Sequence, residues 1–237
     1  MPTYDTRLID RLTVARDTAA FRFAKPEGFA FVPGQTISLA LPQDGGADAP
    51  PLKHTFSLVS APHEDAVCVA TRLRDTPFKR VLAGLAPGAQ ARFSGPYGKL
   101  TLPGEAGRPL ILIAGGIGVT PYMSMLRHAT HAGTPHQFTL LYSNRRAEDA
   151  AFLDELRELT RLNPRLRLLA TLTAPDERWE GLHGRIDAAA VRRAMDGLSD
   201  PWIYITGSPA MVEALGGSLA QAGIPEASIR SEGFYGY

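Results

Sequence analysis

The first pattern with chemical potential in this sequence is a cluster of glycines that follows an apolar run. Residues 110–114 read Leu-Ile-Leu-Ile-Ala, and three of the next four residues are glycine. Glycine lets a backbone approach a ligand closely because no Cβ intervenes. A helix that starts just after such a turn offers free N–H groups and a positive dipole end to a pyrophosphate. The candidate nucleotide contacts are therefore Gly115, Gly116, Gly118, Val119, Thr120 and Pro121.

The spacing of these glycines differs from the G-x-G-x-x-G fingerprint of dinucleotide-binding folds. Simple packing of a strand against a helix is therefore an alternative interpretation. Pro121 favours a helix start, because a proline in the first turn lacks an N–H group that would be unpaired there anyway. The position of the turn, at the first strand-to-helix crossover of the second half, favours a nucleotide site.

The sequence offers little to metal or disulfide chemistry. Cys68 is the one cysteine among 237 residues, so neither an internal disulfide nor a four-cysteine cluster can form. We predict no metal site, and any iron–sulfur relay must lie on another molecule. The 25 Lys and Arg residues nearly balance the 24 Asp and Glu residues, which gives no reason to expect nucleic acid or a membrane surface as a partner.

The second half of the chain alternates apolar runs of strand length with helical patterns. This alternation predicts a parallel, doubly wound α/β sheet, with its ligand crevice at the carboxyl ends of the strands. Helices are expected to begin near Thr120, Asp149, Asp187 and Pro209. The expected strands are 110–114, 138–142, 166–172, 202–206 and a last one near Ile229.

The first hundred residues instead contain short strand-like runs separated by Gly, Pro and Asp, which predicts an antiparallel barrel. Strands are expected around Phe21 and Phe23, at 36–41 and at 66–73, with one helical patch at 78–85. A stretch at 103–109, rich in Gly and Pro, reads as a linker. We therefore expect a barrel domain over residues 1–103 and a nucleotide-binding domain over residues 108–237.

Residues 114–121, Ala-Gly-Gly-Ile-Gly-Val-Thr-Pro, resemble the pyridine-nucleotide motif of the ferredoxin–NADP reductase superfamily. Further motifs of that superfamily follow in its usual order: Pro-Gly-Gln at 33–35, His-Thr-Phe-Ser at 54–57, Gly-Pro-Tyr-Gly at 95–98, Leu-Tyr-Ser-Asn-Arg at 141–145, Thr-Gly-Ser-Pro-Ala-Met at 206–211 and Glu-Gly-Phe at 232–234. The resemblance covers nearly the whole chain. It implies a Greek-key flavin-binding barrel followed by an NAD(P)-binding domain.

The resemblance implies that Phe56 lies against the flavin ring and that Ser57 hydrogen-bonds near its N5 atom. The arginine that usually pairs with the flavin pyrophosphate is replaced by His54, and we expect Lys79, with Arg80, to supply the missing charge. A solvated basic face is the alternative for these two cations, and an ordinary core strand is the alternative for Phe56. The full set of expected FAD contacts is His54, Thr55, Phe56, Ser57, Val69, Thr71, Phe78, Lys79 and Arg80.

On the nicotinamide side, Thr206 takes the place of the superfamily's common cysteine, and Glu232 and Phe234 are expected beside the flavin. Arg145 and its neighbour Arg146 are candidates for a 2′-phosphate contact, but the choice between NADPH and NADH stays open. The expected catalytic residues are Ser57, Thr206, Glu232 and Phe234. The remaining expected nucleotide contacts are Ser143, Asn144, Arg145, Gly207, Ser208, Pro209 and Met211.

The resemblance implies hydride transfer from NAD(P)H to FAD and electron delivery to an external acceptor: a ferredoxin, a flavodoxin, an oxygenase component or a small molecule. A ferric-chelate or free-flavin reductase is one alternative, because the His54 motif also resembles the ferric reductase branch. A non-catalytic electron-transfer subunit is another. The uncharged stretch 110–126 is interrupted by glycines and is shorter than the ~20 residues of a membrane helix. We expect a cytoplasmic monomer that does not enter a membrane.

Overall fold

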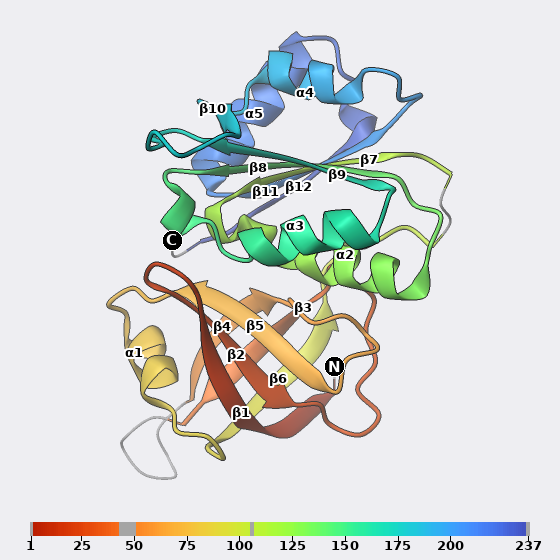
Figure 1. Cartoon of the computed structure of the whole chain (residues 1–237). Helices are drawn as coiled ribbons and strands as arrows, with labels where there is room; N and C mark the ends of the chain where they lie inside the picture. Colours follow the sequence, from red (N-terminus) through yellow and green to blue (C-terminus); the bar gives the residue numbers. More distant parts are fainter. Residues whose placement is uncertain (1, 43–50, 105–106, 236–237) are drawn as a thin grey trace. The chain divides into compact units, whose positions relative to one another are not determined.

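The computed structural model describes residues 2–42, 51–104 and 107–235. It groups the chain into two compact units (Figure 1). The first comprises Met1–Leu102 together with Thr120–His128, and the second comprises Pro103–Val119 together with Ala129–Tyr237. The expected domains were residues 1–103 and 108–237.

The first unit is built on a six-stranded antiparallel sheet with the order β4-β3-β6-β1-β2-β5. A bridge between Leu58 and Val69 links the chain just after β4 to β5, so the two ends of the sheet meet and a barrel closes. This is the predicted architecture. The strands are β1 (Thr3–Ala15), β2 (Thr18–Ala24), β3 (Thr36–Leu41), β4 (Leu52–Ser57), β5 (Ala66–Arg72) and β6 (Gln90–Tyr97).

Alternating apolar residues fill the barrel, because successive side chains of a strand point to opposite faces. Phe21 and Phe23 on β2 are both fully buried. One helix, α1 (Pro77–Gly84), packs against this core, and the hydroxyl of its N-cap, Thr76, accepts a hydrogen bond from the Lys79 N–H at 3.3 Å. The helix buries Phe78, Lys79 and Leu82.

The second unit is the expected parallel sheet, with six strands in the order β10-β9-β8-β7-β11-β12. Helix α3 lies on one face, and α4 and α5 lie on the other (Figure 1). The strands are β7 (Leu110–Gly115), β8 (Phe138–Asn144), β9 (Leu166–Leu172), β10 (Leu182–His183), β11 (Trp202–Gly207) and β12 (Ile229–Gly233). The helices are α3 (Leu153–Leu162), α4 (Ala188–Met195) and α5 (Pro209–Gln221).

Helix α3 begins later than the sequence predicted. The segment Ala147–Asp149 forms a separate 3₁₀ turn, η2, and the Asp149 carboxylate accepts a hydrogen bond from the N–H of Arg146 at 3.1 Å. Phe152 then adopts a left-handed conformation, with φ of 61°, before the helix starts at Leu153. The acidic residue that looked like a helix start therefore caps the short turn instead.

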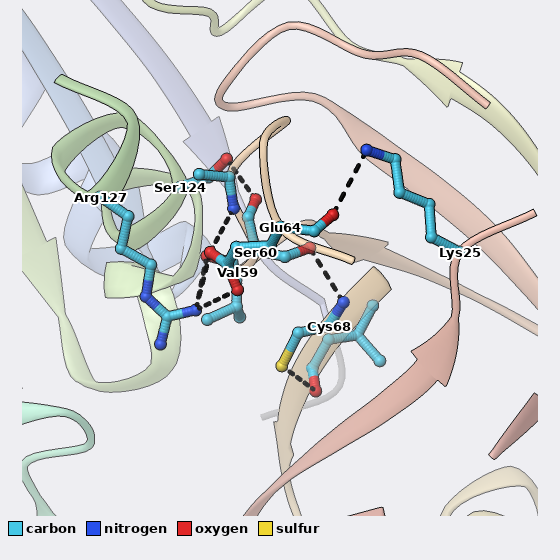
Figure 2. Close-up of polar contacts among 9 residues, drawn as sticks. Lys25, Val59, Ser60, Glu64, Cys68, Ser124 and Arg127 are labelled. Atoms are coloured by element: carbon cyan, nitrogen blue, oxygen red, sulfur yellow. Dashed lines mark hydrogen bonds and ion pairs between the residues drawn. The ribbon is translucent and has the colours of Figure 1, made fainter. Parts of the chain in front are cut away.

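Helix α2 (Thr120–Ala132) begins at the predicted residue. Within the first unit, its Ser124 hydroxyl donates to the Ser60 carbonyl at 2.7 Å, and the Arg127 guanidinium lies 3.4 Å from the Glu64 carboxylate (Figure 2). These contacts with the loop after β4 explain why Thr120–His128 groups with the barrel. Among the described residues, no helix is both long and apolar enough to span a membrane.

Candidate functional site

The glycine turn of the second unit is held tightly by protein atoms. Strand β7 ends at Gly115, and residues Gly116–Val119 form a 3₁₀ turn, η1, in which Gly116 has a φ of 54°. A Cβ on Gly118 would lie 2.6 Å from the carbonyl oxygen of Thr206, and one on Gly115 would lie 2.3 Å from the sulfur of Met211. Both distances are too short for a side chain. At Gly118 the collision is with backbone, so packing within the protein itself requires glycine there, whereas at Gly115 the colliding group is the flexible side chain of Met211.

Thr206, near the end of β11, packs directly against the glycine turn. Its side chain is fully buried, and its hydroxyl donates a 2.7 Å hydrogen bond to the carbonyl of Gly118. The next residues start α5: the Ser208 hydroxyl accepts a hydrogen bond from the N–H of Met211 at 3.3 Å, and Pro209 stands in the first turn. Thr206 therefore connects the glycine turn to β11.

The end of β8 contributes a buried amide. Asn144 is 7% exposed, and its Oδ1 atom has no hydrogen-bond partner among the described residues. A buried acceptor without a donor is costly, and such an atom often awaits a ligand or a water molecule. Ser143 is half-buried and Arg145 is exposed, whereas Arg146 forms an ion pair of 3.5 Å with Glu148.

Strand β12 brings the C-terminal motif to the same edge of the sheet. Its parallel register places Glu232 opposite Thr206, and the N–H of Phe234 donates to the Gly207 carbonyl at 2.8 Å. Burial raises the pKa of Glu232 above its ordinary value. Phe234 is half-buried, while Tyr235 is 82% exposed. The carboxyl ends of β7, β8 and β11 thus carry residues expected to contact the nucleotide, and β12 brings Glu232 and Phe234, expected beside the flavin, to the same edge of the sheet.

In the first unit, three rings gather where β4 meets α1. The imidazole of His54 stacks on Phe56, with ring centroids 4.6 Å apart, and the ring of Phe78 lies 5.4 Å from His54 and 5.6 Å from Phe56. Phe56 and Phe78 are each 6% exposed, while His54 is only half-buried. The more accessible of these rings is therefore that of His54, whereas Phe56, which the resemblance places against the flavin ring, is nearly covered.

A basic group is centred on His54: Lys79 acts electrostatically on His54, and the exposed Arg74 acts on Lys79. Lys79 is only 4% exposed, and its pKa is lowered by burial and then by the positive charge of Arg74. The pKa of His54 is also lowered, by burial first and then by Lys79, although a hydrogen bond to the Thr55 carbonyl at 2.9 Å acts in the opposite direction. Each of these shifts reflects cationic groups held close together in a poorly solvated place.

The other expected flavin contacts are placed less favourably. Arg80 is exposed and forms an ion pair of 2.6 Å with Asp75, so it does not join the buried cations. Val69 is fully buried and Thr71 is 5% exposed, so their side chains present little surface on β5. Arg74, an exposed residue that was not among the expected flavin contacts, lowers the pKa of Lys79 by its charge.

Comparison with known proteins places the chain. Residues 112–216 match the family model described as an oxidoreductase NAD-binding domain. Ferredoxin–NADP reductase B of Sorangium cellulosum is 32% identical over 222 residues, which is 90% of this chain and 89% of the relative. This chain belongs to the ferredoxin–NADP reductase family. The motifs at 33–35, 54–57, 114–121 and 206–211 are therefore those of a true member of the family.

Other members resemble this reductase over different shares of their length. The reductase component of propane 2-monooxygenase from Mycolicibacterium goodii is 26% identical and is covered to 64% of its length, with 92% of this chain aligned. A structure of a ferredoxin NADP⁺ reductase from Neisseria gonorrhoeae with bound FAD and NADP has a TM-score of 0.83 and 21% identity, with 98% of this chain and 99% of that chain covered. This last likeness concerns the fold.

Proposed function

We propose that this reductase transfers a hydride from NAD(P)H to FAD and passes the electrons on to a separate acceptor. The observation that carries the proposal is the packing of the His54 ring against Phe56 on β4 and Phe78 on α1, beside the buried Lys79. His54 lies within the flavin motif at 54–57, and the chain belongs to the ferredoxin–NADP reductase family.

The basic group fits an anionic ligand such as the FAD pyrophosphate. In the protein alone, Arg74 and Lys79 repel each other, and Lys79 in turn disfavours the protonated form of His54. A doubly charged pyrophosphate would relieve this repulsion, because each ammonium or guanidinium would gain an opposite charge at short range. Lys79 is thus the residue that would hold the pyrophosphate where most of the family uses an arginine.

FAD, when bound, supplies a ring that accepts a hydride at N5 and releases electrons singly or in pairs. The chain itself supplies position and polarity. The Ser57 hydroxyl, 7% exposed at the end of β4, would donate a hydrogen bond near N5. Glu232 has a raised pKa, so this carboxyl can hold a proton closer to neutral pH than an exposed glutamate can. Phe234 completes the set of residues that we assign to the reaction.

NAD(P)H would be held by the carboxyl edge of the parallel sheet. The turn η1 would face its diphosphate, and the buried Oδ1 of Asn144 would accept a hydrogen bond from a hydroxyl or amide of the nucleotide. Arg145 would meet a 2′-phosphate if the donor is NADPH. Both NADPH and NADH are retained as donors.

The test begins with the purified protein. We expect a yellow protein whose flavin, released by heat, elutes as FAD, and whose visible absorbance bleaches under anaerobic addition of NADPH or NADH. A colourless protein without affinity for flavin would contradict the proposal. Recovery of FMN alone would contradict the FAD assignment.

The acceptor is proposed to be a ferredoxin or flavodoxin, because the Sorangium relative that this chain covers to 89% is a ferredoxin reductase. Reduction of a ferredoxin by the pre-bleached protein should be faster than reduction of a ferric chelate or of free flavin. Faster ferric-chelate reduction would favour the ferric reductase alternative, and failure to reduce even ferricyanide would favour a non-catalytic subunit. We further propose a monomer located in the cytoplasm, to be checked by sedimentation and by cell fractionation.

A further inference from the structure

Thr206 was expected to act at the nicotinamide, but its contacts point elsewhere. The hydroxyl of Thr206 has two carbonyl oxygens in reach, that of Gly118 at 2.7 Å and that of Ile113 at 3.5 Å. A hydroxyl has one proton to donate, and the shorter distance assigns it to Gly118. The side chain is fully buried, so the described structure gives the hydroxyl no exposed surface.

The carbonyl of Gly118 cannot accept the hydrogen bond that would continue the 3₁₀ pattern of η1. In a 3₁₀ turn each carbonyl accepts from the N–H three residues later. Three residues after Gly118 stands Pro121, which has no N–H. The hydroxyl of Thr206 supplies a donor where the continuation of η1 cannot, and it does so from the neighbouring strand, since Thr206 pairs with Ala114 on β7.

The backbone of β11 packs closely against the turn at Gly118 and restricts its position. A Cβ on Gly118 would meet the carbonyl carbon of Thr206 at 2.8 Å and the nitrogen of Gly207 at 2.9 Å, so the backbone of the turn rests directly on the backbone of β11. Met211 fills the space beside Gly115 and Gly207, with its sulfur 2.9 Å from the position of a Cβ on Gly207. The other contacts here are van der Waals contacts with backbone and with Met211, and the hydrogen bond from Thr206 to Gly118 adds a polar interaction to them.

We propose that Thr206 is a positioning residue, which fixes the turn at 115–119 in the shape that binds the diphosphate of the pyridine nucleotide. This inference rests on the proposed function. It assigns Thr206 to the backbone that binds the diphosphate rather than to the nicotinamide ring, and Thr206 acts there by its hydrogen bond to the carbonyl of Gly118. Loss of the hydroxyl should therefore weaken binding of the half of the nucleotide that carries no nicotinamide.

The test uses ADP-ribose and its 2′-phosphate as probes, because they contain the diphosphate and lack the nicotinamide ring. Binding to the FAD-loaded full chain is measured by calorimetry for wild type, Thr206→Val and Thr206→Ser. Of the two probes, the comparison uses the one that wild type binds more tightly. We expect Thr206→Val to bind that probe about 3- to 10-fold more weakly, as loss of one net hydrogen bond implies. Thr206→Ser keeps the donor and should stay within about twofold of wild type.

Thr171→Val is the matched control. Thr171 is also a buried strand threonine of this sheet, on β9, and its hydroxyl also donates to a glycine carbonyl, that of Gly184, at 2.8 Å. Loss of the Thr171 hydroxyl should lower the thermal midpoint about as much as Thr206→Val does, without lowering the affinity for the probe. If Thr206→Val does not retain flavin, Thr206→Cys is measured in its place, because a thiol is a weak donor on a side chain of similar size. Its probe affinity should then fall below that of wild type, as expected for Thr206→Val.

Unchanged probe affinity in Thr206→Val would overturn the inference, as would equal weakening in Thr206→Ser, which would assign the effect to the methyl group. A loss of the limiting rate of flavin bleaching with intact probe affinity would return Thr206 to the nicotinamide and also overturn it. These results differ from failure of the proposed function, in which the wild-type flavin is not bleached by either nucleotide.

Discussion

The ring of His54 stacks on the ring of Phe56 at 4.6 Å and 23°, and the electrostatic influence of Lys79 reaches that same imidazole. A stacked, partly buried imidazole beside an ammonium is driven to its neutral form, because both burial and like charge disfavour its protonation. His54 therefore contributes little positive charge near neutral pH, although it occupies the arginine position of the flavin motif. Lys79 is left as the buried cation of that site.

This arrangement makes FAD affinity depend on pH. The pKa of His54 is lowered in the free protein, and a bound pyrophosphate would raise it, so FAD binding should take up a proton. We expect the affinity to increase as pH falls from 7.5 to about 5.5, measured by quenching of flavin fluorescence on titration of the apoprotein. His54→Gln should remove most of this dependence, and a pH-independent wild type would contradict the assignment of His54 to the pyrophosphate.

Removal of the Lys79 charge should weaken FAD directly. A buried charge-assisted hydrogen bond contributes about 1.5–3 kcal/mol, so we expect Lys79→Met to raise the dissociation constant of FAD by roughly 10- to 100-fold. The affinity of the variant should also depend less on salt. Lys53→Met is the control, because Lys53 is exposed on β4, the strand that carries His54. Equal affinity and salt dependence in Lys79→Met and wild type would return Lys79 to a structural role.

Donor choice is expected to depend on Arg145. Its side chain is exposed just beyond β8, whereas the neighbouring Arg146 already faces Glu148 at 3.5 Å. Arg145→Ala should lower kcat/KM for NADPH by roughly 10-fold or more and leave that for NADH nearly unchanged, because NADPH alone carries a 2′-phosphate. Arg167→Ala, at an exposed arginine of β9, provides the baseline. A parallel loss with both donors would show that Arg145 does not read the 2′-phosphate.

The sequence predicted strands and helices best where burial is periodic. Strands at 36–41 and 166–172 were expected at the bounds that the structure gives, and α2 and α5 begin at the expected residues. Strand β1 (Thr3–Ala15) was not foreseen. Most of its side chains are exposed and it carries two bulges, so no apolar alternation marks it. It is defined by backbone pairing with β2 and β6, which local sequence does not encode.

For the candidate site too, the order of the motifs was predictable and the individual side-chain contacts were not. The resemblance brought Glu232, Phe234 and the glycine turn to one sheet edge, because the order of parallel strands follows from the fold. It did not foresee that His54 would cover Phe56 or that the Thr206 hydroxyl would bond to the Gly118 carbonyl. The first is a contact between two residues of β4, and the second joins β11 to the turn η1. They depend on side-chain geometry, which motif spacing does not specify.

The glycine of the Pro-Gly-Gln motif gives a prediction about stability within the first unit. Gly34 has a φ of 98°, and a Cβ there would lie 2.2 Å from the Leu100 carbonyl oxygen and 2.4 Å from the Met125 methyl. Gly34→Ala therefore combines a strained backbone with a collision against backbone that cannot easily move. We expect a loss of about 3 kcal/mol or more, which corresponds to a drop of roughly 6–12 °C in the thermal midpoint of a chain of this size.

Gly28 provides the matched comparison, since it also has a positive φ, of 74°, but nothing lies within 4 Å of the position of its Cβ. Gly28→Ala carries the backbone cost alone, about 1 kcal/mol, and should lower the midpoint by only about 2–4 °C. The measurement is the thermal midpoint of each variant loaded with FAD, followed by circular dichroism. Equal losses in the two variants would show that crowding around Gly34 contributes nothing and that its conformation alone requires glycine.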